Sequence, residues 1–360
     1  MFWLGLAVAV CFIPGYTGAS IPTQWVLLSC VVPLALWRKG EMTLLHWAGV
    51  AFLAYACLSL AWARDFYLGI WGVWTWTILA LVVWLGSTED SLNGLFRGLA
   101  IGMSVSSTLA VIQYLGWNPV VTINPLRPAG LFFNPMAHGE ILALTIVALV
   151  SLRLWPYIPA LLPGVALSGS RGAFIALGVG LLCVYLRRLP TILFAIAALL
   201  FVIGFAYSPT DTMRLQIWRV AWENLNLRGW GTGSFMGLMY MSSPTNLMHP
   251  EFTHNDYLQL AFEYGLVAAI PLGIFLLVLR QVSAPEWPIL VTFLFMGTFS
   301  FPLYMPVTAF IAALCTGRLA RGWSSAWYRS GERRHGVVLG DQPRGSQTDR
   351  VREAVIPILP

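Results

Sequence analysis

Residues 171–188 read RGAFIALGVGLLCVYLRR, a run in which only the first residue and the last two are charged. An apolar segment of about this length, bounded by arginine at both ends, is typical of a helix that crosses a lipid bilayer. Lys and Arg in short loops collect on the cytoplasmic side of a membrane. The Arg187-Arg188 pair therefore predicts a cytoplasmic end for this helix and puts Arg171 at the outer surface.

The composition of the whole chain also predicts a membrane protein. Of its 360 residues, 58% are hydrophobic, only 10% are charged and 17 are tryptophan, which excludes an ordinary soluble domain. We expect an all-α, polytopic membrane fold of about twelve transmembrane helices. The expected spans are residues 2–18, 22–37, 43–62, 67–86, 94–116, 137–152, 154–169, 171–186, 190–207, 258–279, 286–302 and 304–320.

The basic residues set the predicted orientation of these spans. Of 21 Lys and Arg residues, six fall on one side: Arg64, Arg127, Arg171, Arg214, Arg219 and Arg228. The other side holds the remainder, so it is predicted to be cytoplasmic together with both termini. Residues 1–321 form the predicted transmembrane domain, and the arginine-rich residues 322–360 a disordered cytoplasmic tail. Since topology and tail account for the net charge of +6, that charge does not indicate nucleic-acid binding.

One long polar segment, about residues 208–257, interrupts the apolar pattern and is predicted to be a large outer loop. Cations and histidines are concentrated in it, namely Arg214, Arg219, Arg228, His249 and His254. Arginine neutralises phosphate, and histidine accepts a proton from a hydroxyl near neutral pH. The loop therefore predicts chemistry at the outer face of the membrane.

The loop ends at His254-Asn255-Asp256, where a new apolar segment begins. A helix that starts at His254 would carry five residues on one face, His254, Leu258, Ala261, Gly265 and Ala268. The small residues would let another helix approach closely beneath the histidine. We interpret His254 as a rigidly held proton acceptor with an ordinary pKa of about 6.5. A histidine that only caps the helix is the alternative.

Arg171 lies in the segment Ser168-Gly169-Ser170-Arg171-Gly172 and opens a predicted helix. The free N–H groups and the positive dipole end of a helix N-terminus favour anions. A guanidinium there, between glycines that let a ligand approach the backbone, predicts a phosphate site. The alternative is an arginine that extends to the lipid headgroups.

Inside the loop, Arg214, Trp218 and Trp222 are spaced one turn apart, which predicts an amphipathic helix on the membrane surface. Gly229, Gly231 and Gly233 then alternate in a turn. We expect a flexible lid there, or a close passage of backbone past a ligand. A nucleotide loop is not indicated, because no strand precedes the glycines and no Lys-Ser/Thr pair follows them.

A second outer segment, residues 124–138, contains Arg127, Asn134 and His138 among prolines and glycines that exclude a regular helix. Arg127 and Asn134 are candidate ligand contacts, and a purely structural turn is the alternative. No HExxH motif, Cys/His cluster or suitably spaced pair of carboxylates occurs, so neither a metal nor a cofactor is expected.

Taken together, these motifs resemble the O-antigen ligase and polymerase family of bacterial surface-polysaccharide assembly. The family pattern of His-[Asn/Ser/Gln], nine residues and Gly is similar to His254, Asn255 and Gly265, with Ala268 where the pattern has Gly, Thr or Tyr. Further similarities are Ser170-Arg171-Gly172 to a Ser-Arg-Gly segment, Asn134-Pro135 to an Asn-Pro element, and Arg214, Trp218, Gly231 and Gly233 to a loop signature. The family's ligases carry Leu four residues after the loop arginine, where this chain has Trp218.

The resemblance implies a metal-independent glycosyltransferase of the bacterial inner membrane that uses no cofactor. A glycan would move from an undecaprenyl-diphosphate-linked donor to an acceptor hydroxyl at the periplasmic face. Arg171 and Arg214 would bind the donor diphosphate and stabilise the leaving group. His254 would act as base or position the acceptor. Asn255, Trp218, Gly231, Gly233, Asn134 and Arg127 would complete the substrate-binding surface.

The acceptor stays open, and with it the type of enzyme. A ligase would use lipid A-core, a repeat-unit polymerase would use the growing polysaccharide, and a protein O-oligosaccharyltransferase would use a protein. A transporter of polysaccharide or lipid-linked glycan is the alternative from another class. Transporters place ionisable residues near the bilayer midplane. Here the deepest ones lie near the ends of the predicted spans, His46, Arg97, Glu140 and Glu263, which favours the enzyme.

Overall fold

A computed structural model describes residues 1–10, 25, 26, 28–118, 127–132, 134–186, 211–236, 252–279 and 284–334. These residues form helices joined by short turns, with no strand among them, so the expected all-α class is confirmed. The predicted span 190–207 and the residues after 334 lie outside the described part of the chain.

The helices follow one another in a simple order. They are α1 (Phe2–Ala9), α3 (Val31–Trp37), α4 (Leu44–Ser59), α5 (Phe66–Thr88), α6 (Asn93–Tyr114), α7 (Pro135–Ser151), the 3₁₀ turn η1 (Trp155–Tyr157), α8 (Ile158–Ser168) and α9 (Arg171–Tyr185). Then come α11 (Asp211–Glu223), α13 (Asp256–Tyr264), the 3₁₀ turn η2 (Gly265–Ala268), α14 (Ala269–Val278), α15 (Trp287–Met296) and α16 (Pro306–Arg334).

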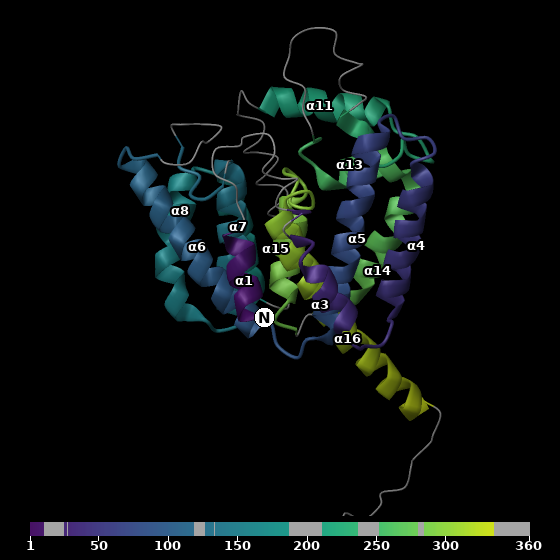
Figure 1. Cartoon of the computed structure of the whole chain (residues 1–360), viewed down its shortest axis with the longest axis horizontal. Helices are drawn as coiled ribbons and strands as arrows, with labels where there is room; N and C mark the ends of the chain where they lie inside the picture. Colours follow the sequence, from purple (N-terminus) through teal and green to yellow (C-terminus); the bar gives the residue numbers. More distant parts are fainter. Residues whose placement is uncertain are drawn as a thin grey trace, which may run out of the picture.

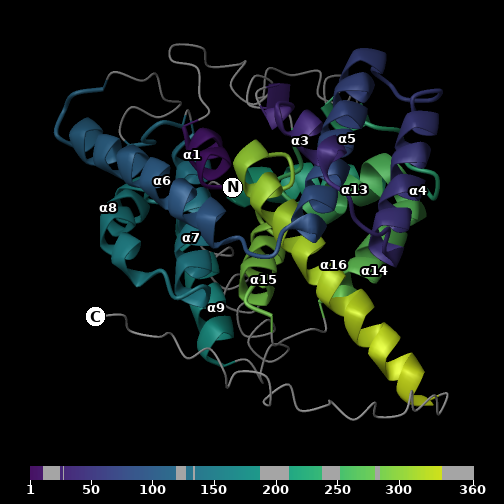
Figure 2. The same cartoon turned by 60° about the horizontal axis from the view of Figure 1, so that its bottom comes forward.

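The helices form two groups around a central pair. On one side α6 packs against α1 and α8, and α7 packs against α8 and α9. On the other side α5 packs against α3 and α4, and α4 packs against α14 (Figure 1). Between them, α15 contacts α7 and α9, while α16 packs along α5 and touches α15, as Figure 2 shows from below. Helix α11 lies across one end of this bundle and contacts α13 (Figure 1).

Glycines allow the helices to pack with their backbones close together. Gly98 of α6 lies against the carbonyl of Phe2 in α1, and Gly86 of α5 lies against the carbonyl of Leu314 in α16. A Cβ at either position would overlap the neighbouring main chain. Such small-residue contacts are a common basis of helix association in membranes, where lipid tails offer no hydrophobic drive.

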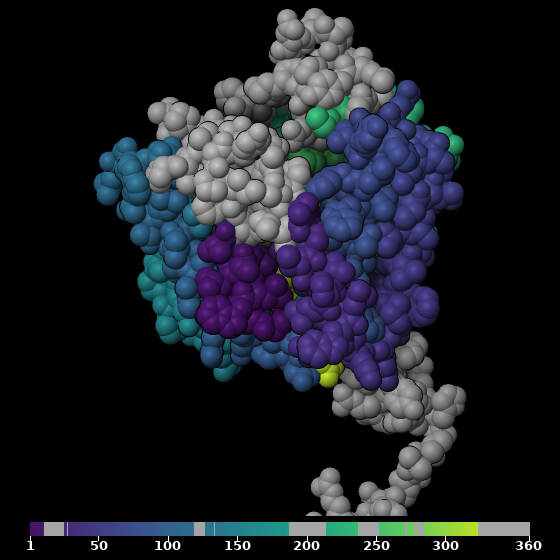
Figure 3. Space-filling model, viewed as in Figure 1, coloured from purple at the N-terminus to yellow at the C-terminus, as the bar shows by residue number. Residues whose placement is uncertain are grey.

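Two described helices, α5 and α6, are long and apolar enough to cross a bilayer, and four shorter apolar helices accompany them, α4, α7, α9 and α15. Several large apolar side chains of α5 face outward, including Phe66, Tyr67, Ile70 and Trp74. In contrast, every residue of α7 except Met136 is buried, so α7 is a core helix. Figure 3 shows the face on which α1 and α3 lie beside each other.

Three predicted spans differ from the helices at their ends. The span 258–279 is not one helix, because α13 ends at Tyr264 and the 3₁₀ turn η2, which begins at Gly265, lies between α13 and α14. The span 286–302 ends as a helix at Met296, and Pro302 lies in the turn that follows. Helix α16 continues to Arg334, into the segment predicted to be a disordered tail.

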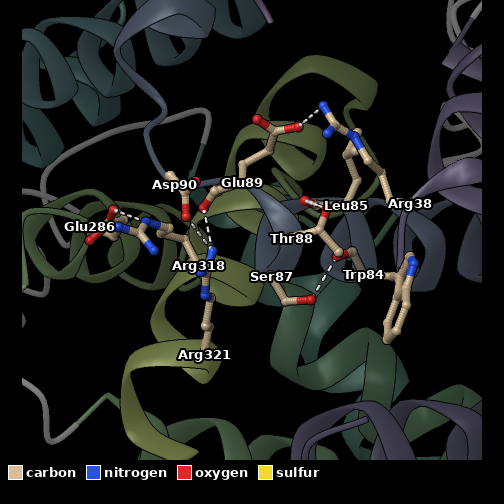
Figure 4. A network of polar contacts seen from close by, with 10 residues as sticks. All are labelled: Arg38, Trp84, Leu85, Ser87, Thr88, Glu89, Asp90, Glu286, Arg318 and Arg321. Carbon is tan, nitrogen blue, oxygen red and sulfur yellow. Dashed lines mark hydrogen bonds and ion pairs between the residues drawn. The ribbon is translucent and has the colours of Figure 1, made fainter. Parts of the chain in front are cut away.

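Ion pairs join four segments at the end of the bundle opposite α11 (Figures 1 and 4). Arg38 contacts Glu89 at 2.7 Å, Arg321 contacts Asp90 at 2.8 Å, and Arg318 contacts Glu286 at 3.8 Å. These pairs connect the end of α3, the α5–α6 turn, the start of α15 and the middle of α16. The Arg321–Asp90 pair is exposed, so it contributes about 0–1 kcal/mol.

Candidate active site

The first turn of α7 is at the centre of the candidate site. Asn134 caps this helix, because its Oδ1 accepts a hydrogen bond from the Met136 N–H at 2.8 Å. Pro135 occupies the first helical position, where its missing N–H costs nothing. Asn134 thus begins the helix, and the ligand contact predicted for its side chain stays a prediction.

Two arginines meet at the turn between α8 and α9. Arg127 donates from Nε and Nη2 to the carbonyl oxygen of Ser168, at 2.9 and 2.6 Å. Arg171 is the first residue of α9 and is exposed, and Ser170 caps the helix by accepting from the Ala173 N–H. Burial and then the positive charge of Arg171 lower the pKa of Arg127. The two guanidinium groups therefore give this helix N-terminus a concentrated positive charge.

A third arginine reaches the same region from α11. The Nη2 atom of Arg214 lies 3.9 Å from the sulfur of Met136, in the first turn of α7. The charge of Arg214 also acts on His254, the residue that the sequence singled out. The structure therefore brings Arg214 and His254 together from two segments that are well separated in the chain.

His254 is held in an unusual conformation just before α13. Its φ of +55° lies in the left-handed region, which non-glycine residues adopt infrequently. The ring lies edge-on to Phe301 with centroids 4.9 Å apart. Its Nδ1 is buried and has no hydrogen-bond partner among the described residues. Burial and then the charge of Arg214 lower the pKa of His254 to about 4, so the ring is neutral at physiological pH.

The predicted helix face below His254 is corrected by this geometry. Helix α13 begins at Asp256, and Asn255 is its cap, with Oδ1 accepting from the Leu258 N–H at 3.0 Å. The helix ends at Tyr264, because Gly265 has a φ of +58°. His254 and Gly265 therefore lie outside the helix on which the prediction placed them. Asn255 also donates from Nδ2 to the Thr298 carbonyl at 3.2 Å.

Trp218 is a structural contact of this segment. Its Nε1 donates to the carbonyl oxygen of Thr253 at 2.8 Å. Thr253 is buried, donates from Oγ1 to the Asn255 carbonyl at 2.6 Å and donates from its N–H to Gln259 Oε1 at 2.9 Å. Trp218 therefore connects α11 to the residue before His254, and the substrate contact predicted for it stays a prediction.

The glycine turn also differs from its prediction. The φ angles of Gly229, Gly231 and Gly233 are +74°, +92° and +72°, which favour glycine. The N–H of Gly231 donates to the Glu263 carbonyl at 2.9 Å. A Cβ on Gly231 would lie 2.8 Å from Ala63 Cα, and one on Gly233 would lie 2.6 Å from the Leu68 carbonyl carbon. Gly231 and Gly233 therefore pack against protein backbone, while the lid or ligand contact predicted for this turn stays a prediction.

Two features unite the arginines and the histidine into one region. On α7, Met136 touches Arg214, and Gly139 one turn later lies against Ser168 and Ser170, beside Arg171. The segment after α15 also contacts both parts of this region, because Phe299 packs on Gly172 and Phe301 packs on His254. A positively charged surface with a neutral imidazole can bind an anion and accept a proton from a neighbouring hydroxyl.

The sequence did not indicate the buried carboxyl groups beside this region. Glu140 and Asp256 are both buried, and they interact electrostatically with each other. The Oδ2 of Asp256 accepts from the Leu303 N–H at 2.9 Å, whereas neither oxygen of Glu140 has a hydrogen-bond partner in the described residues. Glu140 and Asp256 are far apart in the chain, so no local pattern links them. The one signal in the sequence was the helical spacing of Met136 and Glu140, which puts Glu140 on the same face of α7.

Within the described residues no group of three or more His, Cys, Asp or Glu side chains is arranged to hold a metal ion. No known protein family matches the chain, and no curated protein matches it either. Interpretation of the site therefore depends on its own geometry and on the motifs of the sequence.

Proposed function

We propose that this chain is a membrane glycosyltransferase that moves a glycan from an undecaprenyl-diphosphate carrier to an acceptor hydroxyl. The observation that carries the proposal is the meeting of Arg214 with Met136 of α7 and with His254. Arg171, at the start of α9, and Arg127 lie beside the next turn of α7, where Gly139 meets Ser168 and Ser170. This arrangement supplies cations for a diphosphate and a neutral base for a hydroxyl, as the resemblance to the O-antigen ligase and polymerase family implies.

The proposed reaction forms one bond and breaks another at the anomeric carbon. The acceptor oxygen attacks this carbon, and the bond from carbon to the diphosphate oxygen breaks. The leaving diphosphate takes the electron pair, and Arg171 and Arg214 stabilise its developing charge. The acceptor proton passes to the His254 ring. Neither step requires a metal, because the arginines neutralise the diphosphate.

Donor binding would also tune the base. In the protein alone, the positive charge of Arg214 contributes to the low pKa of His254, about 4. A base with so low a pKa accepts protons poorly. An anion bound to Arg214 would offset that charge and raise the pKa of His254. His254 would thus become a better base only when the donor is present.

We further propose that the chain lies in the bacterial inner membrane in about twelve spans. Its termini would be cytoplasmic, and the site would face the periplasm. The outward apolar side chains of α5, among them Tyr67 at 84% and Trp74 at 42% exposed, would contact lipid. The ion pairs of Figure 4 would lie at the cytoplasmic end, because Arg38 and Arg318 belong to the larger group of basic residues, the group predicted to be cytoplasmic.

The proposed activity is tested with purified protein and an undecaprenyl-diphosphate glycan. Three acceptors are offered separately: lipid A-core, a second copy of the lipid-linked glycan, and an unstructured serine-rich protein. We expect glycan to move to one of them without added metal, and to move far more slowly with Arg214→Ala. If the wild-type protein transfers glycan to none of the three acceptors, the proposal is wrong.

A second experiment tests the orientation in a variant without its native cysteines. Gln216 on α11 and Glu41 before α4 are both exposed. Gln216→Cys should react with a membrane-impermeant thiol reagent in intact spheroplasts, whereas Glu41→Cys should react only after permeabilisation. The reverse pattern would invert the proposed topology.

A further inference from the structure

Glu140 is a buried carboxyl group for which the proposed reaction has no assigned role. It lies in the second turn of α7 and is 0% exposed. Neither of its oxygens has a hydrogen-bond partner among the described residues. Burial of an ionised carboxyl is costly unless an opposite charge or hydrogen bonds compensate. A compensating group should therefore lie close to Glu140.

The helix geometry indicates which group this is. Met136 and Glu140 are four residues apart on α7, so they lie on one face with Glu140 one turn deeper. The guanidinium of Arg214 touches the Met136 sulfur with Nη2 at 3.9 Å. Arg214 and Glu140 also interact electrostatically. Arg214 therefore lies above the face of α7 that carries Glu140.

The other acidic groups around Glu140 are less suited to pair with Arg214. Asp256 interacts with Glu140, and its Oδ2 accepts from the Leu303 N–H, while its Oδ1 is buried without a hydrogen-bond partner among the described residues. Glu263 accepts a hydrogen bond from Gln259 Nε2 at 3.1 Å, within α13. The buried Ser300 hydroxyl also interacts with the Glu140 carboxyl, but a neutral hydroxyl supplies no positive charge. Glu140 is the carboxyl that combines an electrostatic interaction with Arg214 and a place on the Met136 face of α7.

We infer that Glu140 is a positioning residue, a buried counter-charge that fixes the guanidinium of Arg214 so that its outer edge binds the donor diphosphate. This inference rests on the proposed function. An arginine side chain has many rotamers, and a fixed carboxylate behind the guanidinium restricts them. Restricting them matters because small displacements of a group at the reacting centre cost about 100-fold in rate. Glu140 itself touches neither the donor nor the acceptor.

The pair can be tested without any enzyme assay, by a double-mutant cycle on thermal unfolding in detergent. The variants are Glu140→Gln, Arg214→Gln and both together. Arg214→Gln removes the positive charge that acts on buried Glu140, Glu140→Gln removes the carboxylate that acts on half-buried Arg214, and the double change removes both charges. We expect the double variant to unfold at a higher temperature than the sum of the two single losses predicts. Should Glu140→Gln alone fail to fold, recovery of folded protein in the double variant supports the pair, and no recovery contradicts it.

Glu263→Gln is the matched control. It removes a carboxyl that is also buried but accepts its hydrogen bond from Gln259 of its own helix. Combined with Arg214→Gln, it should give additive losses. Additive losses for Glu140 as well would overturn the inference, because they would mean that its carboxyl is independent of Arg214.

An activity cycle then tests the positioning role. Glu140→Gln should lower kcat by about 10- to 100-fold, with a smaller change in KM for the donor, since Arg214 keeps its charge. In the Arg214→Gln background the same change should lower the remaining rate little further. A wild-type protein without transfer activity would refute the proposed function, whereas an active protein with additive losses would refute only the role of Glu140.

Discussion

Trp218 donates a hydrogen bond from Nε1 to the carbonyl oxygen of Thr253 at 2.8 Å, and Thr253 directly precedes His254. This bond connects the middle of α11 to the residue before His254. The φ angle of His254 is positive although His254 is not a glycine. Arg214 lies one turn before Trp218 on α11. Helix α11 therefore sets the positions of the arginine and of the histidine together.

Loss of this bond should displace His254 without removing any group that reacts. Trp218→Phe keeps most of the ring but has no N–H donor, so we expect kcat for glycan transfer to fall by about 10-fold or more. Trp222→Phe on the same helix is the control, because Trp222 is 70% exposed. Both variants should reach the membrane in normal amounts. Equal activity in the two variants would show that the Thr253 bond does not position the site.

The sequence predicted several helices closely, because their apolar runs end at recognisable residues. The spans 94–116 and 171–186 correspond to α6 and α9 within two residues at each end. The start of α9 was visible in Ser170 and Arg171, a helix cap followed by a charge. The sequence also assigned Arg171, Arg214 and His254 to one face of the membrane, and that these residues form one site stays a prediction.

The failures of prediction come from backbone angles and tertiary contacts. Small residues at 261, 265 and 268 fit a tightly packed helix face, but Gly265 is needed for a φ of +58° and for close contact with Leu227. Gly231 and Gly233 approach protein backbone, and sequence does not tell which backbone a glycine approaches. The inferred pairing of Glu140 with Arg214 depends on how α11 lies relative to α7, which no local pattern encodes.

Gly231 should therefore be essential for folding. Gly231→Ala would put a Cβ at a φ of +92° and 2.8 Å from Ala63 Cα. Strain of this kind costs about 1–3 kcal/mol, so we expect a lower unfolding temperature in detergent and less protein in the membrane. The control is Gly178→Ala in α9, where a Cβ would meet no atom within 4 Å. If Gly231→Ala is as stable as Gly178→Ala, the packing of Gly231 against Ser59 and Ala63, at the end of α4 and in the turn after it, is not required.

Arg171 should act on the donor through its charge and its geometry. Arg171→Ala should lower kcat by about 10²- to 10³-fold, the usual effect of removing one electrostatic donor from a leaving-group site. Arg171→Lys should restore little, because an ammonium group cannot make the paired hydrogen bonds of a guanidinium. Arg219→Ala is a suitable comparison, since Arg219 is exposed and pairs with Glu223 on α11. Normal transfer by Arg171→Ala would assign this arginine to the lipid headgroups.

The last prediction concerns the proton that His254 accepts. Its low pKa, about 4, replaces the ordinary value expected from the sequence. A lowered pKa means that the neutral, active form persists as the pH falls, so kcat/KM for the donor should stay level through neutral pH and fall only as the pH approaches 4. The kcat profile reports the pKa of His254 in the complex of enzyme and donor. There the diphosphate bound to Arg214 offsets one of the two causes that lower this pKa. The acid limb of kcat should therefore lie at higher pH than that of kcat/KM.

Two variants separate proton transfer from positioning in this profile. His254→Ala should lose about 10²- to 10⁴-fold in rate, and the acid limb should disappear. His254→Gln keeps a hydrogen-bonding group but accepts no proton, so it should be nearly as slow as His254→Ala. Near-normal turnover by His254→Gln would mean that His254 orients the acceptor hydroxyl, and that departure of the diphosphate from Arg171 and Arg214 carries the catalysis. In that case the fall in rate at low pH would be due to another group of the site. A shift of this acid limb along the pH axis should then be looked for in Glu140→Gln.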